Sequence, residues 1–381
     1  MRPRLLRGSI LRADDGWPAG AVLAVTSPWR LLLALAVTLA AVASSAIADT
    51  ALDVRPPRGA RVDGRPDRFV VCDRPGSTQI LGIAVGGRVV SAARLLAGET
   101  AALDPKRCEP PAMARPSVQC DLGSGAGVVN IDVRLTDRGR RLGQAIFGDR
   151  WEYRALRMRR LVGTESVTWA DYQIELPADE MFEDRVVRHV GPVGGTRSDA
   201  CGSGFLVIRS HVRHGAALTM YSLAHAVGLE PRAVSEPLGA PDRWRDVVGI
   251  ADVVGDGRPR IVEVTEPHLI GRLQVNDLRD GRILAAVSRD GYTTHRVGTM
   301  RQGIGALVDL SGDGIADIVV PTSDWKCLAV LTALRGQLRE LGRLSCAESP
   351  LVDVLATDLD GDGKDDVVAI RADGTLEAWM R

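Results

Sequence analysis

Two acidic, glycine-rich loops near the C-terminus carry the side chains best suited to bind a metal ion. They read Asp-Leu-Ser-Gly-Asp-Gly-Ile-Ala-Asp over residues 309–317 and Asp-Leu-Asp-Gly-Asp-Gly-Lys-Asp-Asp over residues 358–366. A hard cation such as Ca²⁺ takes roughly six to eight oxygen ligands, which alternating carboxylates in a tight turn supply. We therefore expect two Ca²⁺ sites, with side-chain ligands at loop positions 1, 3, 5 and 9 and a carbonyl ligand at position 7: Asp309, Ser311, Asp313, Ile315 and Asp317 in one site, and Asp358, Asp360, Asp362, Lys364 and Asp366 in the other.

A third loop, over residues 252–260, keeps the glycine spacing but loses two of these ligands. Val254 and Arg260 stand at positions 3 and 9, so we expect no metal here. We hypothesise that the guanidinium of Arg260 bridges Asp252 and Asp256 in place of an ion, as a charge-assisted contact.

The three loops recur at an interval typical of a repeated β unit. Their first aspartates, Asp252, Asp309 and Asp358, are 57 and 49 residues apart. Each loop leads into a short apolar run rich in β-branched residues, and after residue 366 an Asp-Gly turn separates this run from a second one. That pattern predicts a β-hairpin, and the interval matches a four-stranded propeller blade.

A helix–loop–helix calcium protein is excluded by the same segments. Such a protein needs amphipathic helices and a glutamate at loop position 12. This sequence has strand-like runs instead, with Val320 and Ala369 at position 12.

The Asp-x-Asp/Ser-Gly-Asp-Gly-x-x-Asp-apolar pattern resembles the FG-GAP/VCBS repeats of integrin-α-type β-propellers. The resemblance covers residues 244–381 and fades toward residue 67. It implies an all-β fold, a six- or seven-bladed β-propeller over residues 67–381, with Ca²⁺ in the loops that connect strands. Because the chain ends on a third strand, we expect an N-terminal strand to complete the last blade.

The N-terminal part shows the pattern of a secretory signal peptide. Arg30 precedes an uncharged stretch of 13 residues, 31–43, and small residues lead to Ala48. This stretch is shorter than the ~20 residues that cross a bilayer, so the alternative is an uncleaved anchor lengthened through Ala48. We expect a leader and signal peptide at 1–48, a linker or irregular segment at 49–66 and the propeller at 67–381, in the periplasm or secreted, with no membrane insertion after cleavage.

The six cysteines predict disulfide bonds, because the chain is expected to be exported and no pair has Cys-x-x-Cys spacing. Buried free thiols are the alternative. The favoured pairs are Cys108–Cys120 and Cys327–Cys346, which leaves Cys72–Cys201 by elimination.

The charge balance excludes a strongly basic nucleic-acid-binding protein. The chain has 48 Lys+Arg and 48 Asp+Glu among 381 residues, and removal of residues 1–48 leaves a net charge of −3. With 45% hydrophobic residues, the composition is that of a globular protein.

No catalytic motif is present in the sequence. The six histidines have no recognised catalytic spacing, and Gly202-Ser203-Gly204 lacks the full frame of a nucleophile elbow. We therefore expect a non-enzymatic binding or adhesion scaffold for an unknown protein or glycan ligand. Two alternatives remain open: a propeller enzyme acting on polysaccharide or another polymer, and a structural subunit of an envelope assembly. Carboxylates and histidines that converge at the centre favour an enzyme, whereas an exposed apolar patch favours a protein partner.

Overall fold

A computed structural model of the chain describes most residues from residue 57 onward. The described residues are 52, 57–73, 79–99, 102–103, 105–109, 117–121, 128–162, 168–190, 204–224 and 228–381. All of them belong to one compact unit, Ala51–Arg381. The predicted leader and signal peptide at 1–48 lie outside the described residues, and no described helix is long and apolar enough to cross a membrane.

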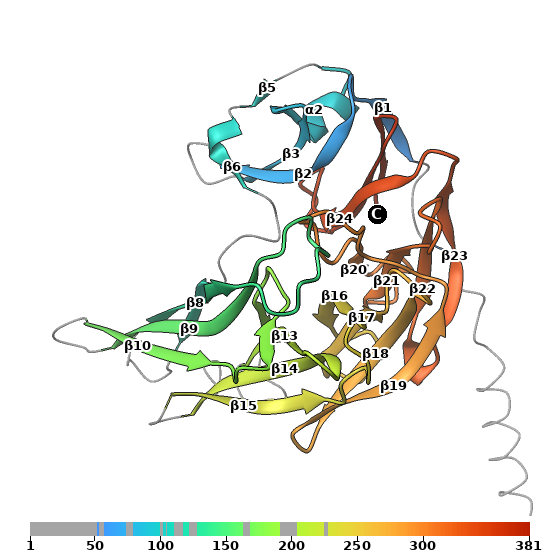
Figure 1. The fold of residues 1–381 in the computed structure, drawn as a ribbon. Coiled ribbons are helices and arrows are strands. Elements are labelled where there is room, and N and C mark those ends of the chain that lie inside the picture. The colour runs from blue at the N-terminus through green and yellow to red at the C-terminus, as the bar shows by residue number, and fades with distance from the viewer. Residues whose placement is uncertain are drawn as a thin grey trace, which may run out of the picture. The chain divides into compact units, whose positions relative to one another are not determined.

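The fold is all-β, as expected. Among the described residues the helices are α2 (Ala92–Leu96) and two short 3₁₀ turns, η1 (Pro105–Arg107) and η4 (Leu334–Gly336). Strands make up four hydrogen-bonded sheets (Figure 1).

Three of these sheets are small and antiparallel, and each contains a meander of consecutive strands. One contains β20 (Ala306–Val308), β21 (Asp317–Pro321), β22 (Cys327–Thr332) and β23 (Arg339–Cys346). A second contains β24 (Leu351–Thr357), β25 (Asp366–Arg371) and β26 (Thr375–Trp379), with β1 (Arg58–Arg61) at its outer edge. The third contains β2 (Pro66–Asp73), β3 (Gln79–Val85), β4 (Arg88–Ser91), β5 (Ala102–Leu103) and β6 (Cys108–Glu109).

The fourth sheet has 13 strands, because a short parallel pairing between β15 and β19 joins two antiparallel groups. The first group holds β7 (Ser117–Asp121), β8 (Val128–Gly139), β9 (Glu152–Val162), β10 (Thr168–Glu175), β11 (Glu180–Phe182), β12 (Arg188–Val190), β13 (Gly204–His211), β14 (Gly215–Ala224) and β15 (Gly228–Ser235). The second group is a four-stranded meander of β16 (Arg245–Ala251), β17 (Arg260–Thr265), β18 (Arg272–Arg279) and β19 (Arg282–Asp290).

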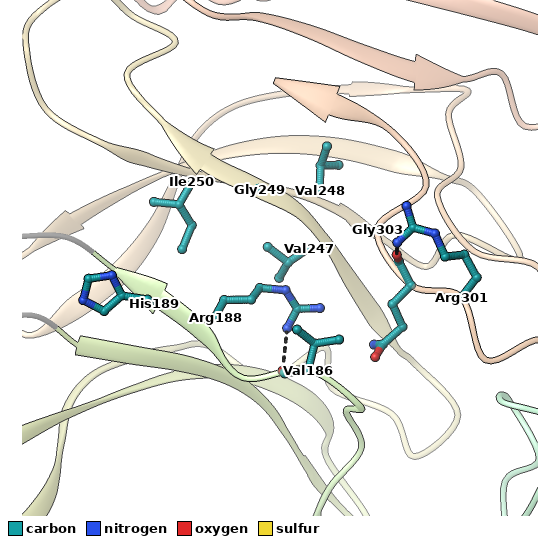
Figure 2. Close-up of a pocket in the computed structure, with 10 residues that line it drawn as sticks. Val186, Arg188, His189, Val247, Val248, Gly249, Ile250, Arg301 and Gly303 are labelled. Carbon is teal, nitrogen blue, oxygen red and sulfur yellow. Dashed lines mark hydrogen bonds between the residues drawn. The ribbon is translucent and has the colours of Figure 1, made fainter. Parts of the chain in front are cut away.

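The first strands of the meanders lie beside one another. Strand β16 contacts β20, β20 contacts β24, and β24 contacts β2. A four-stranded meander whose first strand borders the next meander is the arrangement of a propeller blade. The middle of β16 also lines a cavity (Figure 2).

Apolar side chains join each meander to the next. Three buried clusters span neighbouring sheets, and each fully buried aliphatic side chain contributes about 1.5–3 kcal/mol. Representative members are Val262 and Ile318 in the first cluster, Val330 and Val367 in the second, and Ile83 and Ile370 in the third.

The hairpin predicted at the end of the chain is confirmed by β25 and β26. The Thr375 backbone N–H donates to Asp373 Oδ1 at 3.0 Å, which closes the turn. Gly374 has φ 89°, and a Cβ there would lie 2.3 Å from the carbonyl oxygen of Val62, so the turn requires glycine.

An N-terminal strand completes the last meander, as expected from the chain ending on a third strand. Strand β1 pairs antiparallel with β26, with Gly59 opposite Glu377 and Ala60 opposite Leu376. Residues 58–61 are therefore a strand within the segment 49–66, which we expected to be a linker or irregular.

One of the three predicted disulfides is confirmed, and the other two, Cys108–Cys120 and Cys72–Cys201, are wrong, because Cys72 and Cys108 are bonded to each other. Cys327 is bonded to Cys346, as expected. Cys108, however, is bonded to Cys72 and not to Cys120, because β6 pairs with β2 and places these two residues directly opposite each other. The side chain of Cys120 and all of Cys201 lie outside the described residues.

Candidate functional site

The loop over residues 358–366 connects β24 to β25 and is folded around its first aspartate. Asp358 Oδ1 accepts the backbone N–H of Gly361 at 2.7 Å, and Asp358 Oδ2 accepts that of Gly363 at 3.0 Å. Both glycines have positive φ, 83° and 85°, so the tight turn depends on them. The result is a compact loop with its carboxylates drawn together.

Three of the four predicted carboxylate ligands in this loop are brought together. Asp358, Asp360 and Asp366 each offer an oxygen, and these oxygens lie within 4.8 Å of one another. The fourth, Asp362, accepts the Lys364 N–H at 2.9 Å. This oxygen set fits a hard cation such as Ca²⁺.

Asp366 is the buried member of this cluster. It is 1% exposed, and burial raises its pKa, with the nearby charges of Asp360 and Asp362 acting in the same direction. A bound cation would offset both effects, because it favours the ionised carboxylate.

The loop over residues 309–317 has the same backbone fold between β20 and β21. Asp309 accepts N–H groups from Gly312 and Gly314, each at 2.8 Å, and Asp313 Oδ1 accepts from Ile315 at 2.9 Å. Asp317, at position 9, is 2% exposed, and burial raises its pKa to about 6. Its Oδ2 accepts the backbone N–H groups of residues 310 and 311.

The guanidinium of Arg381 forms an ion pair with Asp309, the first expected ligand of that loop. Arg381 Nη2 is 2.7 Å from Asp309 Oδ2, and the backbone N–H of Arg381 donates to Asp366 Oδ1 at 3.1 Å. The last residue therefore contacts both acidic loops. Only in the 358–366 loop do three His, Cys, Asp or Glu side chains of the described residues meet as a metal-ligand set.

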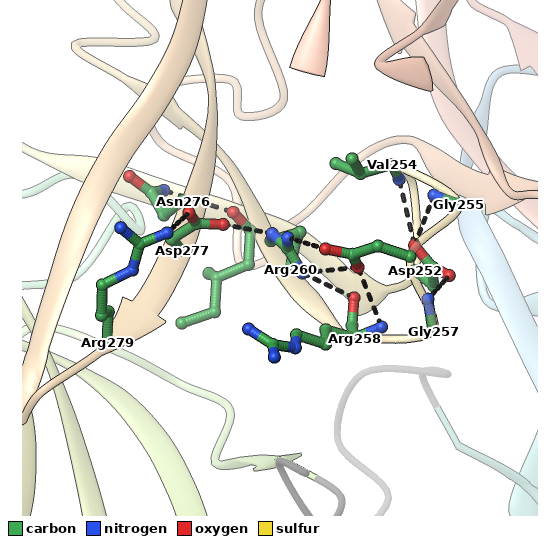
Figure 3. Close-up of polar contacts among 11 residues, drawn as sticks. Asp252, Val254, Gly255, Gly257, Arg258, Arg260, Asn276, Asp277 and Arg279 are labelled. Carbon is green, nitrogen blue, oxygen red and sulfur yellow. Dashed lines mark hydrogen bonds and ion pairs between the residues drawn. The ribbon is translucent and has the colours of Figure 1, made fainter. Parts of the chain in front are cut away.

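The loop over residues 252–260 uses an internal cation, but not in the way we hypothesised. Arg260 forms a bidentate contact with Asp256, at 3.2 and 2.7 Å, and a further ion pair with Asp277 of β18 (Figure 3). Asp252 does not take part in this ion pair. Its two oxygens instead accept the backbone N–H groups of Val254, Gly255 and Gly257, because the loop backbone wraps around this carboxylate.

A cavity of 270 Å³ lies where β12, β16 and the segment 301–303 meet. Figure 2 shows the side chains of Arg188, His189 and Arg301 around it, together with valines of β16 and of residue 186. Its complete lining is Val186, Arg188, His189, Val247, Val248, Gly249, Ile250, Arg301, Gln302 and Gly303.

Buried carboxylates hold the segment 301–303 in place. Asp246 Oδ2 accepts the Gly303 N–H at 2.8 Å, and burial raises the pKa of Asp246 to about 7. Asp353 Oδ1 accepts from Arg301 Nε at 2.8 Å, and Asp353 Oδ2 accepts the Phe69 N–H at 3.0 Å. These contacts link β16, β24 and β2 around the cavity.

This cavity is not predictable from the sequence. Its residues come from three stretches between 186 and 303, so no local spacing marks them. The only sequence signal is the presence of polar residues, Arg301 and Gln302, four residues or more before the apolar strand β20.

Comparisons with known proteins supply no family. No family model matches the chain, and no curated protein matches it. Among solved structures, crystal structures of BBS1N in complex with ARL6DN, soaked with mercury or with lead, align over 87% of this chain and 97% of theirs at 11% identity, with TM-scores of 0.41 and 0.40. Similarity at this level does not assign a function.

Proposed function

We propose that this chain is an exported, calcium-stabilised β-propeller that acts as a non-enzymatic binding scaffold for a protein or glycan. The observation that carries the proposal is the Asp358–Asp360–Asp366 cluster, which lies in the loop between the first two strands of a blade-like meander. The blades would run from β2 to the closing pair of β26 and β1, with a total of six or seven.

Export is supported by cysteine chemistry. Two disulfide bonds join neighbouring strands, Cys72–Cys108 and Cys327–Cys346. Such bonds persist in oxidising compartments, such as the periplasm or the extracellular space. This agrees with the secretory signal read from residues 1–48, which we propose is cleaved after Ala48.

Within the proposal, the two acidic loops are not equivalent. In the 358–366 loop the carboxylates converge on a common point. In the 309–317 loop, a cation that used Asp309 would first have to displace the guanidinium of Arg381. We therefore assign the stronger Ca²⁺ site to Asp358, Asp360 and Asp366, and a weaker one to the loop that starts at Asp309.

The cavity offers side chains that can bind a ligand. Its charged groups are two arginines, which recognise anionic groups.

Thermal unfolding in CaCl₂ and in EGTA tests the calcium proposal. A ligand at about 100 times its Kd stabilises the folded state by about 2.7 kcal/mol, so calcium should raise the Tm of the wild-type chain by a few degrees. Asp360→Asn removes one ligand, and Asp365→Asn removes one exposed charge from the same loop outside the ligand positions. We expect the calcium shift to shrink in the first variant and to persist in the second; equal Tm values of the wild type in both buffers would refute the proposal.

A further inference from the structure

We infer that the cavity between β12, β16 and the segment 301–303 binds a small carboxylic acid with a short apolar portion. This inference goes beyond the proposed function, because it concerns a site away from the acidic loops and needs no calcium. It rests on the polar atoms, the charges and the walls of the cavity.

Two polar atoms at the cavity have no partner in the described part of the chain. Gln302 is 2% exposed; its Oε1 accepts the Arg185 N–H at 2.8 Å, whereas its Nε2 has no acceptor. The Nε2 of His189, another lining residue, is also buried without a partner. The Gln302 Nε2 is a donor, and an unsatisfied buried donor costs about 1–3 kcal/mol, so an acceptor supplied by a ligand would be favoured here.

The charges of the lining select an anion. Arg188 Nη1 donates to Asp184 Oδ2 at 2.8 Å, and Arg301 Nε donates to Asp353 Oδ1 at 2.8 Å. Both carboxylates are fully buried and neither lines the cavity. Arg188 Nη1 also donates to the Val186 carbonyl at 3.2 Å, and Arg301 donates from Nη1 to the Gln302 carbonyl at 2.7 Å and from Nη2 to the Val354 carbonyl at 3.4 Å. A guanidinium has five N–H donors, more than these contacts use, so both arginines keep N–H groups for an anionic ligand.

The walls select a carboxylate over an inorganic oxyanion. Four aliphatic residues, Val186, Val247, Val248 and Ile250, share the lining with the polar groups. An ion such as sulfate would leave this apolar surface uncovered, whereas an aliphatic acid covers it and still presents two oxygens to planar N–H donors. A water molecule occupies about 30 Å³ of liquid, so a cavity of 270 Å³ has room for on the order of nine water molecules. This size limits the ligand to a small molecule.

Calorimetric titration of the full chain in EGTA tests this inference without the acidic loops. The probes are straight-chain carboxylates from acetate to hexanoate, the corresponding neutral amides, and sulfate. We expect affinity to rise with chain length and each amide to bind at least about tenfold more weakly than its acid. No binding of any acid, or amides that bind as well as the acids, would overturn the inference. Tightest binding by sulfate would replace it with an inorganic anion site.

Two variants tie binding to this cavity. Gln302→Glu keeps the oxygen that accepts from Arg185 but replaces the unpartnered donor with a negative charge, so we expect at least tenfold weaker binding of hexanoate. Gln337→Glu makes the same change at an exposed position and should bind as the wild type does.

His189→Phe removes the second unpartnered nitrogen and keeps an aromatic ring against Phe205, so it should weaken binding several-fold. Unchanged affinity in both Gln302→Glu and His189→Phe would place any observed binding elsewhere. If Gln302→Glu does not fold, the acid–amide comparison on the wild type still decides the matter. Because all titrations are in EGTA, a failure here leaves the calcium experiment unaffected.

Discussion

The carboxyl group of Glu183 is deeply buried. It is 3% exposed, and Ser210 Oγ donates to its Oε2 at 2.8 Å. Burial raises the pKa of Glu183 to about 8, and the negative charges of Glu152, Asp242 and Asp184 add to this shift. At neutral pH the folded protein therefore holds a proton that the unfolded chain releases.

This proton makes stability depend on pH. The contribution of Glu183 is complete below the ordinary glutamate pKa of 4.5 and is lost as pH rises toward about 8. Glu183→Gln mimics the protonated form, so we expect its free energy of unfolding to exceed that of the wild type by a margin that grows by about 1 kcal/mol or more from pH 5 to pH 8.

Urea unfolding of both proteins across this range is the measurement. The buried pair His268 and His295, whose pKa values burial lowers to about 4 and about 3, acts in the opposite direction below pH 6.5. That contribution is the same in both proteins and cancels in the comparison. Glu230→Gln, at an exposed position, is the control and should follow the wild type. A margin that stays constant with pH would show that Glu183 is ionised in the folded state.

At the residue scale, disulfide bonds and ion pairs between side chains are the features that the sequence predicts least well. The Cys327–Cys346 bond was predictable because both residues belong to one hairpin-sized segment. The Cys72–Cys108 bond was not, since it depends on β6 returning to the edge of β2 across a segment of 36 residues. Arg260 shows the same limit: its contact with Asp256 lies within the loop, but its second partner, Asp277, comes from the neighbouring strand.

At the scale of elements, the three homologous loops share one backbone fold and differ in what neutralises their charge. In each loop the first aspartate accepts N–H groups from the following turn. The cation near the loop is Arg260 in the first and Arg381 in the second, while the third gathers three carboxylates. Repeat spacing predicts the shared backbone, because turn glycines and the capping aspartate are local features.

The loop at 252–260 should therefore depend on its arginine for stability. Arg260 is 9% exposed in its side chain, and its guanidinium lies between Asp256 and Asp277. Arg260→Gln removes the cation that Asp256 and Asp277 share and leaves Asp277 with the exposed Arg279 only, so we expect a loss of about 1–3 kcal/mol in the free energy of unfolding.

Urea unfolding in EGTA measures this loss without calcium binding. Arg279→Gln is the matched control, because Arg279 also contacts Asp277 but is 66% exposed, and it should change stability by no more than about 0.5 kcal/mol. An equal effect of both substitutions would mean that Arg260 holds the loop no more strongly than a surface charge does.

At the scale of the whole molecule, the sequence predicts the repeated strands and loops. It does not predict contacts between segments that are distant in sequence. The hairpin of β25 and β26 and the closing role of an N-terminal strand follow from the repeat and from where its last copy ends. The joining of β15 to β19 and the cavity beside β16 do not, because they bring together segments with no shared pattern. Binding sites built by convergence of this kind require the fold before they can be recognised.

The pairing of β1 with β26 leads to a prediction about the whole fold. Strand β1 is the outer strand of the last meander, and it covers β26, whose Leu376 and Ala378 are fully buried. In an antiparallel pair, one of two adjacent residues points its N–H toward the partner strand. Substituting both Gly59 and Ala60 with proline removes that donor whichever residue carries it, and we expect a loss of about 1–3 kcal/mol.

Amide hydrogen exchange of β26, Thr375–Trp379, measured at increasing urea reports on this pairing; total fluorescence does not, because the chain has seven tryptophans. If β1 stabilises the last meander, the β26 amides of the double proline variant should exchange at lower urea than those of the wild type. Gly59→Ala is the control, since a Cβ there has only an ordinary contact, 3.9 Å from the Leu376 carbonyl oxygen. A proline variant that unfolds at the wild-type midpoint would mean that β26 holds its place without β1, and that the N-terminal strand covers the sheet edge without stabilising the fold.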